Sequence, residues 1–293
     1  MNQLRKKINW MHVISYSILY VILFLIALMI IYPYLYMLFT SFKTSQEVID
    51  NAEVYLFPKS FTLLAYFGDS MYSVLEIIPY FRGFANTMIV EGAFLTFGVL
   101  SSFSAAYAFS KMHFAGKNFF FITIVSSMMI PFVVTLMPLY SVYSKLYLTN
   151  TFWPLVIPHL CGNAGMMFFV KQYLDGVPTE LVEAGKIDGM SSFRICWQVI
   201  FPLALPAVAT QVVFVFLSIW NDVLGPDLYL EEVDKKTLQV LLRYLMNTGG
   251  GMKLSNQPVA MAGSVLASLP VLLLYGFCQK YFVGAISASG VKG

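Results

Sequence analysis

The composition of this chain indicates a lipid environment. Of its 293 residues, 58% are hydrophobic and only 11% are charged, and the mean hydropathy is +0.73. A soluble domain usually carries about 25% charged residues, so the charges here are too few to cover a water-facing surface and a soluble globular protein is excluded. The net charge of +3 gives no reason to expect nucleic acid as a partner. The cysteines and histidines are scattered without metal-ligand or disulfide spacing, so no metal site is expected.

Six apolar stretches are long enough to cross a bilayer, for which a helix needs about 20 residues. They lie at about residues 12–42, 84–110, 118–143, 153–170, 203–219 and 259–282. The first is too long for the apolar core of a cleaved signal peptide, so we expect an uncleaved helix. No internal repeat or interdomain linker is visible in the sequence, and we expect one all-α transmembrane domain over residues 1–293.

Lys and Arg residues orient the chain, because cytoplasmic segments beside spans are enriched in them. With the N-terminus inside, the cluster Arg5-Lys6-Lys7 and the short segment 111–117 lie in the cytoplasm, and the acidic cluster 222–234 lies outside. We therefore expect a multi-pass protein with both termini cytoplasmic. The polar segment 171–202 then faces the cytoplasm.

The segment 171–202 has the pattern of a short helix, a turn and a second short helix. Pro178 suits the first turn of a helix. Asp188-Gly189 predicts its end, since glycine accepts the left-handed conformation that commonly closes helices. Ser191 or Ser192 is placed to cap the second helix. Its apolar residues then share one face: Phe193, Cys196, Trp197 and Ile200. Pro202 and Pro206 are expected to mark the return into the membrane.

Two interpretations of this helix pair are open. It either lies on lipid headgroups or docks on a soluble partner protein. Its first helix interleaves acidic, basic and apolar residues: Glu180, Leu181, Val182, Glu183, Lys186, Ile187 and Asp188. A lipid-surface helix normally presents a cationic face, whereas acids outnumber bases here. A protein groove with some positive charge is the favoured partner.

The residues of this loop resemble a known family. Glu183-Ala184-Gly185, with Gly189 and Pro202, resembles the "EAA" loop of permease subunits in binding-protein-dependent ABC importers. The chain resembles more narrowly the smaller permease of maltose-type, carbohydrate-uptake systems, over nearly its whole length. Further segments support this: 105–109, 128–131, 181–189, 220–222 and 290–293. Two residues depart from the pattern, since Gly185 stands where the family usually has alanine and Phe201 where leucine usually precedes the proline.

The resemblance implies the ABC importer permease fold, with six transmembrane helices and a cytoplasmic helix-turn-helix coupling loop in a prokaryotic cytoplasmic membrane. It also implies a second, homologous permease in a heterodimer, two ATPase subunits, and an external solute-binding protein that delivers a sugar or oligosaccharide. The implied coupling residues are Glu183, Ala184, Gly185, Asp188 and Gly189, and the implied C-terminal ATPase contacts are Gly290, Val291, Lys292 and Gly293. The sequence has no G-x-x-x-x-G-K-[ST] motif, so a transport subunit without its own ATPase site is expected. ATP and Mg²⁺ would bind to the partner ATPases, and no cofactor to this chain.

Polar and aromatic residues in or near the spans are candidates for the substrate pathway. Asn163, in a glycine-flanked break of the fourth span, is a candidate donor to a sugar hydroxyl, although close helix packing is the simpler interpretation. Trp220 and its neighbour Asn221 are candidates for stacking on and binding a pyranose, although an interfacial anchor is the commoner role of such a tryptophan. Glu91 is the one acid inside a predicted span, and a snorkelling or helix-contact role competes with a pathway role.

Other classes of function fit the sequence less well. A membrane enzyme is disfavoured because H-E-x-x-H and G-x-S-x-G motifs are missing from the sequence. A secondary transporter would favour mid-membrane acids and inverted repeats. The remaining alternative is an ABC permease for a non-sugar solute, such as a polyol or a glycerol-phosphate compound.

Overall fold

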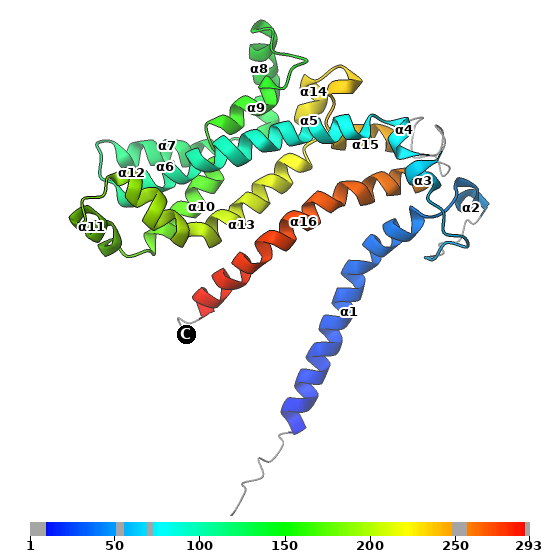
Figure 1. Ribbon diagram of the computed structural model, residues 1–293, viewed down its shortest axis with the longest axis horizontal. Helices are drawn as coiled ribbons and strands as arrows, with labels where there is room; N and C mark the ends of the chain where they lie inside the picture. The colour runs from blue at the N-terminus through cyan, green and yellow to red at the C-terminus, as the bar shows by residue number, and fades with distance from the viewer. Residues whose placement is uncertain (1–9, 51–55, 69–72, 248–256, 291–293) are drawn as a thin grey trace, which may run out of the picture. The chain divides into compact units, whose positions relative to one another are not determined.

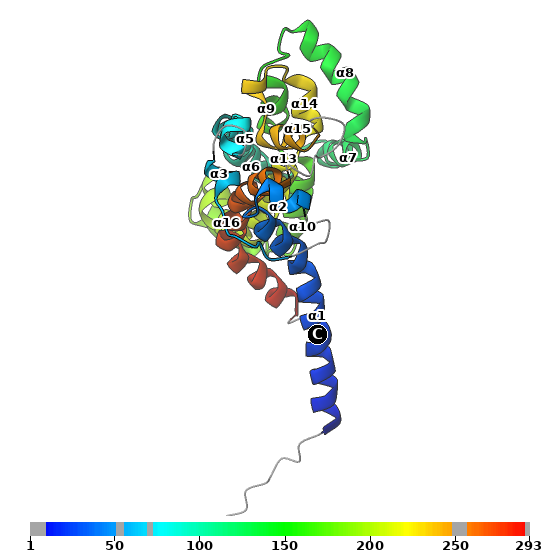
Figure 2. The ribbon, with the colours of Figure 1, turned by 90° about the vertical axis from the view of Figure 1, so that its right-hand side faces the viewer.

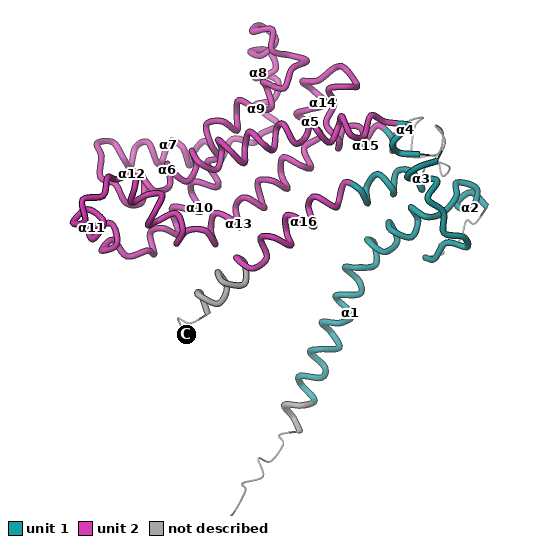
Figure 3. Tube along the Cα trace, in the orientation of Figure 1, with its two compact units in different colours: residues 1–77, 245–266 teal, residues 78–244, 267–293 magenta. Residues whose placement is uncertain are grey.

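The computed structural model describes residues 10–50, 56–68, 73–247 and 257–290, and these are helical, with no strand among them. The expectation of an all-α protein is confirmed. The chain forms two compact units, residues 1–77 with 245–266, and residues 78–244 with 267–293 (Figure 3). The single domain expected over residues 1–293 stays a prediction.

The first unit is built around the N-terminal helix. Its elements are α1 (Trp10–Thr40), α2 (Ser45–Asp50), α3 (Leu64–Phe67), α4 (Val74–Ile77) and the first turns of α16 (Gln257–Gly290). The side chains of α1 are exposed from Ile14 to Tyr32, as an apolar helix surrounded by lipid requires. Beyond α1, the Ser41 hydroxyl lies 2.7 Å from the Tyr66 hydroxyl, and Ser73 donates to the Tyr66 carbonyl oxygen.

The second unit holds the remaining helices, labelled in Figure 1. Its elements are α5 (Tyr80–Ala93), η1 (Phe94–Gly98), α6 (Val99–Lys111), α7 (Lys117–Ser127), α8 (Phe132–Lys145), α9 (Trp153–Leu160), α10 (Ala164–Asp175), α11 (Glu180–Ile187), α12 (Ser192–Arg194), η2 (Ile195–Ile200), α13 (Phe201–Trp220), α14 (Leu224–Tyr229), η3 (Val233–Lys235) and most of α15 (Leu238–Asn247). The segments η1 and η2 are π-helical and continue the helices on either side of them.

The core of the second unit lies where α6, α10 and α13 run side by side (Figures 1 and 2). Phe103 of α6, Met166 of α10 and Ile200, the last residue of η2 before α13, are fully buried there. The same cluster includes Val182 of α11 and Ile195 of η2. The polar loop is therefore fixed to the core by its own apolar residues.

The predicted spans agree with the helices in number but differ in two places. Among the described residues, five continuous helical segments are long and apolar enough to cross a membrane: Ile14–Thr40, Tyr80–Lys111, Trp153–Asp175, Ser192–Trp220 and Gln257–Tyr281. The sixth crossing is the pair α7 and α8, bent by 95°. The span predicted at 118–143 therefore corresponds to a bent pair of helices and not to one continuous helix. Pro131, which has no N–H to continue the first helix, lies at the break.

The fifth span also begins earlier than predicted. The second helix of the loop is not a separate surface helix, because α12, η2 and α13 form one segment from Ser192 to Trp220. Pro202 lies within the first two positions of α13, where its missing N–H interrupts the helix least. The boundary expected at Pro202 and Pro206 therefore lies inside a continuous helical segment that begins at Ser192.

Glu91 of α5 is buried in the second unit, with 0% of its surface exposed. Neither of its carboxylate oxygens has a hydrogen-bond partner among the described residues. Burial excludes the snorkelling role, because a snorkelling group keeps its charged end in water. A buried polar group without a partner lowers stability.

Replacing Glu91 by Met, which has a similar length and no oxygen, is expected to stabilise the detergent-solubilised protein by about 1–3 kcal/mol, the cost of an unsatisfied buried polar group. Thermal unfolding measures the change. The matched control is Glu76→Met, because Glu76 is exposed and its loss should change stability by less than about 0.5 kcal/mol. A lower unfolding temperature for Glu91→Met would contradict the prediction.

Candidate functional site

The polar loop between α10 and α11 and its turn to α12 are defined by local signals. α11 begins at Glu180, after Thr179, so Pro178 lies just before the helix and not in its first turn as predicted. Gly189 ends the helix with φ of +74°, which confirms the predicted glycine stop. The Ser191 side chain accepts a hydrogen bond from the Arg194 N–H at 3.3 Å and caps the next helix.

Gly185 brings α11 close to η2. A Cβ built on Gly185 would lie 2.9 Å from Cγ1 of Ile195, nearer than ordinary side-chain contacts allow. Ile195 is fully buried, and Val182, one turn before Gly185, packs in the same cluster. The glycine that departs from the family pattern therefore permits a close approach between the loop helix and the helix that crosses the membrane.

The opposite face of α11 is exposed. It carries Glu183 and Ala184, and the apolar Ile187 has 86% of its surface exposed. Asp188 and Gly189 follow at the exposed end of the helix. Four of the five predicted coupling residues thus lie at the surface, and Gly185 is buried beneath them. This exposed face is the surface of α11 that is free to meet a partner protein.

Residues missed in the sequence analysis tie the entrance of the loop to α6. The Lys111 ammonium donates to the carbonyl oxygen of Val177. Asp175 accepts hydrogen bonds from Ser110 at 2.8 Å and from Lys171 at 2.7 Å. From the sequence, Lys111 served only to orient the chain. Its place at the end of a predicted span, opposite an acid, was the signal that could have revealed this contact between α6 and the loop.

The predicted pathway residues are occupied in structural contacts. The Asn163 side-chain oxygen caps α10 by accepting from the Met166 N–H at 2.8 Å, and its own N–H donates to Ser102 at 2.7 Å. A Cβ on the preceding Gly162 would lie 2.8 Å from the Ser101 hydroxyl oxygen, so close packing against α6 accounts for the glycine. A pathway role for Asn163 stays a prediction.

Trp220 does not present its ring to a solute in this conformation. Only 1% of its surface is exposed, and it stacks on Phe216 with ring centroids 5.5 Å apart. Phe84 packs edge-on against its other side at 5.9 Å. Asn221 is exposed and donates to the Leu217 carbonyl at 2.8 Å, so its pathway role stays a prediction.

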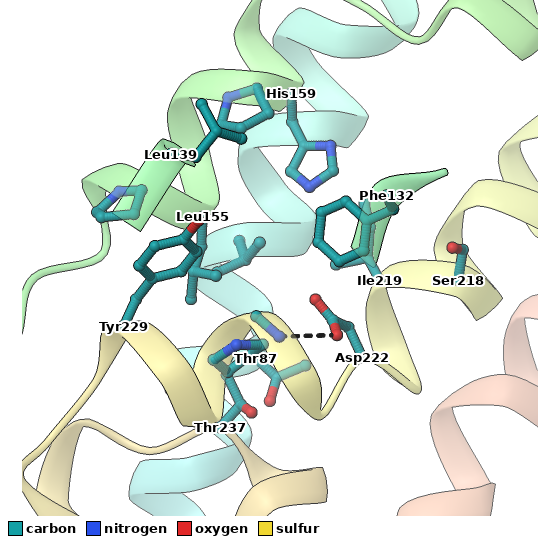
Figure 4. Close-up of a pocket in the computed structure, with 15 residues that line it drawn as sticks. Thr87, Phe132, Leu139, Leu155, His159, Ser218, Ile219, Asp222, Tyr229 and Thr237 are labelled. Atoms are coloured by element: carbon teal, nitrogen blue, oxygen red, sulfur yellow. Dashed lines mark hydrogen bonds between the residues drawn. The ribbon is translucent and has the colours of Figure 1, made fainter. Parts of the chain in front are cut away.

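A cavity of about 390 Å³ lies at the end of α13 away from the loop. Figure 4 shows residues of α5, α8, α9, α13 and α14 around it. Its polar lining residues are Thr87, His159, Ser218, Asp222, Tyr229 and Thr237. Burial raises the pKa of Asp222. The hydrogen bonds that its carboxylate accepts from the Gly225 and Leu224 N–H groups act in the opposite direction and lower this pKa. None of these side chains except Asp222 was singled out from the sequence.

The wall of the cavity is fixed by a second polar cluster. Asn150, in the left-handed region with φ of +57°, accepts from the N–H groups of Glu231 and Glu232 and donates to the Glu232 carboxylate at 2.6 Å. Asp227 binds Lys236 at 3.0 Å. Burial raises the pKa of Asp227, but the Tyr244 hydroxyl and Lys236 outweigh it, and the pKa falls below its ordinary value.

Residues 95–287 match a family described as "Binding-protein-dependent transport system inner membrane component". The chain belongs to this family. Membership places it among multi-pass permeases of the cell membrane and argues against the secondary-transporter alternative. The described residues contain no group of three His, Cys, Asp or Glu side chains that could hold a metal ion.

Curated relatives and a solved structure are similar over almost the whole chain. The Arabinooligosaccharides transport system permease protein AraQ of Halalkalibacterium halodurans is 31% identical, over 92% of this chain and 93% of that protein. The Polygalacturonan/rhamnogalacturonan transport system permease protein YtcP of Bacillus subtilis is 29% identical, over 94% and 97%. A chain of a bacterial ABC transporter that imports the acidic polysaccharide alginate has 25% identity and a TM-score of 0.75, with 96% and 100% covered. The permease fold is thereby confirmed.

The turn at Gly189 provides a test of how the loop is held. Gly189→Ala adds a methyl group with open space around it, so its cost is the backbone strain at φ of +74°, about 1–2 kcal/mol. The variant is expected to lower the unfolding temperature of the detergent-solubilised permease.

The control for that variant is Gly276→Ala in α16. Gly276 is exposed, has open space around it and does not have a positive φ. Alanine there should stabilise the helix by about 0.5–1 kcal/mol. Equal effects of the two substitutions would contradict the assignment of strain to Gly189.

Proposed function

We propose that this permease translocates a sugar or oligosaccharide that an external solute-binding protein delivers, with ATP hydrolysis by partner subunits driving alternating access. The observation that carries the proposal is α11, a polar helix seated on the 192–220 segment with its Glu183 face exposed. The printed names of the relatives, which refer to arabinooligosaccharides and to polygalacturonan, support a carbohydrate as the solute.

The proposed assembly contains a second homologous permease as a heterodimer partner and two ATPase subunits. ATP and Mg²⁺ bind to those ATPases, and this chain is a transport subunit without an ATPase site of its own. The loop 171–202 and both chain ends face the cytoplasm in this proposal. The basic residues next to the short connections support that orientation.

Force would reach the membrane through the packing described above. The ATPases close on ATP, and a basic residue of one of them holds Glu183. Because Gly185 and Val182 press against Ile195, the loop helix cannot move without moving the start of the 192–220 segment. A tilt of that segment displaces its other end, where the cavity lies. The loop therefore acts as a lever on the solute pathway.

Charge reversal at Glu183 tests the coupling. Glu183→Lys is expected to leave the permease inserted but to lower ATP-driven uptake at least ~10-fold, because losing one docking charge pair costs on the order of 2–5 kcal/mol. ATP hydrolysis should become independent of the loaded binding protein. Uptake and hydrolysis are measured in proteoliposomes with the complete assembly.

The control for Glu183→Lys is Glu231→Lys, because Glu231 is equally exposed and lies between α14 and η3, far along the chain from the loop. It should retain near-normal coupling. Wild-type uptake by Glu183→Lys would remove the coupling role from this residue.

The C-terminal tail is a separate proposed contact with the ATPases. Gly290 is the last residue of α16, and Val291, Lys292 and Gly293 lie outside the described residues. Deleting residues 290–293 is expected to change ATPase assembly or hydrolysis more than membrane insertion. Co-purification of the ATPase subunits and their hydrolysis rate measure the effect, and unchanged values for both would refute the contact.

A further inference from the structure

The cavity at the end of α13 has the composition of a small-ligand site. Its volume of about 390 Å³ falls in the range of ligand pockets, roughly 300–1,000 Å³. Most of its walls are apolar, from Leu139, Leu155, Pro158 and Ile219. Such pockets usually add a few convergent polar groups that fix the orientation of the ligand.

Two polar side chains line this space and have hydrogen-bonding capacity that contacts within the protein do not fill. Thr237 has 4% of its surface exposed, and its hydroxyl has no hydrogen-bond partner among the described residues. One Asp222 oxygen accepts from the Gly225 N–H at 3.2 Å, the dashed line in Figure 4, and the Leu224 N–H also donates to this carboxylate. The other oxygen points toward the space in front of Phe132 in the same view. A buried hydroxyl without a partner indicates a place where a ligand or water completes the hydrogen bond.

The aromatic and acidic groups meet around one volume. The Phe132 ring and the Asp222 carboxylate face each other across the cavity, and His159 points in from α9 (Figure 4). A sugar ring has apolar C–H faces for an aromatic wall and hydroxyl groups that donate to a carboxylate. The arrangement therefore suits one pyranose or furanose unit.

Charge sets a limit on which sugars fit. None of the described residues that line the cavity is Lys or Arg. The nearby cations Lys236 and Arg243 both bind Asp227, at 3.0 and 3.5 Å. An acidic sugar would meet Asp222 with no cation to neutralise its carboxylate, and unpaired like charges in a partly buried site repel strongly.

We propose that this cavity is a solute subsite of the permease that accepts an uncharged, hydroxyl-bearing sugar unit and rejects carboxylated or phosphorylated ones. The inference rests on the proposed function and narrows its substrate class. It predicts that this chain does not transport acidic polysaccharides, such as the alginate that the structural relative imports.

The test uses a cysteine placed in the cavity of the assembled transporter in proteoliposomes. Ser218→Cys puts a thiol on the lining, at an exposed position. The parent carries Cys161→Ala and Cys278→Ala and keeps Cys196, which is buried; its own labelling rate is the background. The rate of reaction with an uncharged maleimide is measured alone, with arabinotriose as the neutral probe, and with trigalacturonate as the acidic probe.

Arabinotriose is expected to slow the labelling of Ser218→Cys about threefold when present at twice its dissociation constant, the factor 1 + [L]/Kd. Trigalacturonate at the same concentration should leave the rate unchanged. The matched control is Ser144→Cys on α8, an exposed serine that does not line the cavity. Its labelling rate should be the same under all three conditions.

Asp222→Asn tests the source of the selectivity, because asparagine can still accept the Gly225 N–H but carries no charge. In this background the affinity for trigalacturonate should rise by roughly fivefold, the effect of removing one unit charge a few ångströms away in water. Glu231→Gln makes the same charge change at an exposed residue outside the cavity and should have no such effect.

Three outcomes overturn the subsite. The first is no protection by arabinotriose, and the second is equal protection by trigalacturonate in the Ser218→Cys protein that keeps Asp222. The third is the same change in trigalacturonate affinity for Asp222→Asn and Glu231→Gln. The first two measurements use a protein that keeps Asp222, so they do not depend on how well the Asp222→Asn variant folds. ATP-driven uptake of the ligand held by the cognate binding protein is measured on the same vesicles. Uptake without protection rejects the subsite alone, whereas protection without uptake rejects the proposed function alone.

Discussion

The close contact between Gly185 of α11 and Ile195 of η2 is the constraint on which the rest of this permease depends. A methyl group on Gly185 would approach the Ile195 side chain to 2.9 Å, so the Ile195 side chain packs directly on the glycine and leaves no room for a larger residue. Interiors packed at this density transmit displacement, because the side chains have no free volume to absorb it. A loop helix held only by flexible polar contacts would swing on its own. Here the loop helix and the membrane helix form one packed body.

That body is long enough to connect the two sides of a bilayer. The segment Ser192–Trp220 has 29 residues, about 44 Å at 1.5 Å per residue. The loop is at its first end and the cavity at its last, with Ser218 and Ile219 in the cavity lining. The π-helical stretch η2 lies within its first turns, and such stretches are frequent at functional sites. One continuous helical segment therefore joins the proposed docking surface to the proposed solute subsite without any intervening loop.

Hydropathy predicted the number of crossings, because burial in lipid demands apolar stretches whatever their detailed path. It could not locate the break between α7 and α8, since the residues around it, such as Met128 and Ile130, are as apolar as those of a straight helix. Pro131 was the available signal for that break. The continuous helix from Ser192 was missed because two prolines were interpreted as a boundary, whereas Pro202 occupies a position where proline is tolerated. The glycine turn at Gly189 was predictable because it depends on one backbone conformation.

The cavity was beyond sequence reasoning, because its lining depends on which helices meet. Asp222 follows the end of one helix, Phe132 is at the start of another, and Thr237 lies 105 positions later than Phe132 along the chain. Each is unremarkable alone: an acid after a span, an aromatic residue near an interface, a threonine before a helix. Their meeting is what supports the proposed subsite, since an unpartnered hydroxyl such as that of Thr237 is costly in a partly buried place unless something completes its hydrogen bond. Glu91 carries the same kind of cost without facing the cavity, so unsatisfied polarity by itself does not identify a site. What distinguishes the cavity is the room for a ligand beside the unsatisfied group.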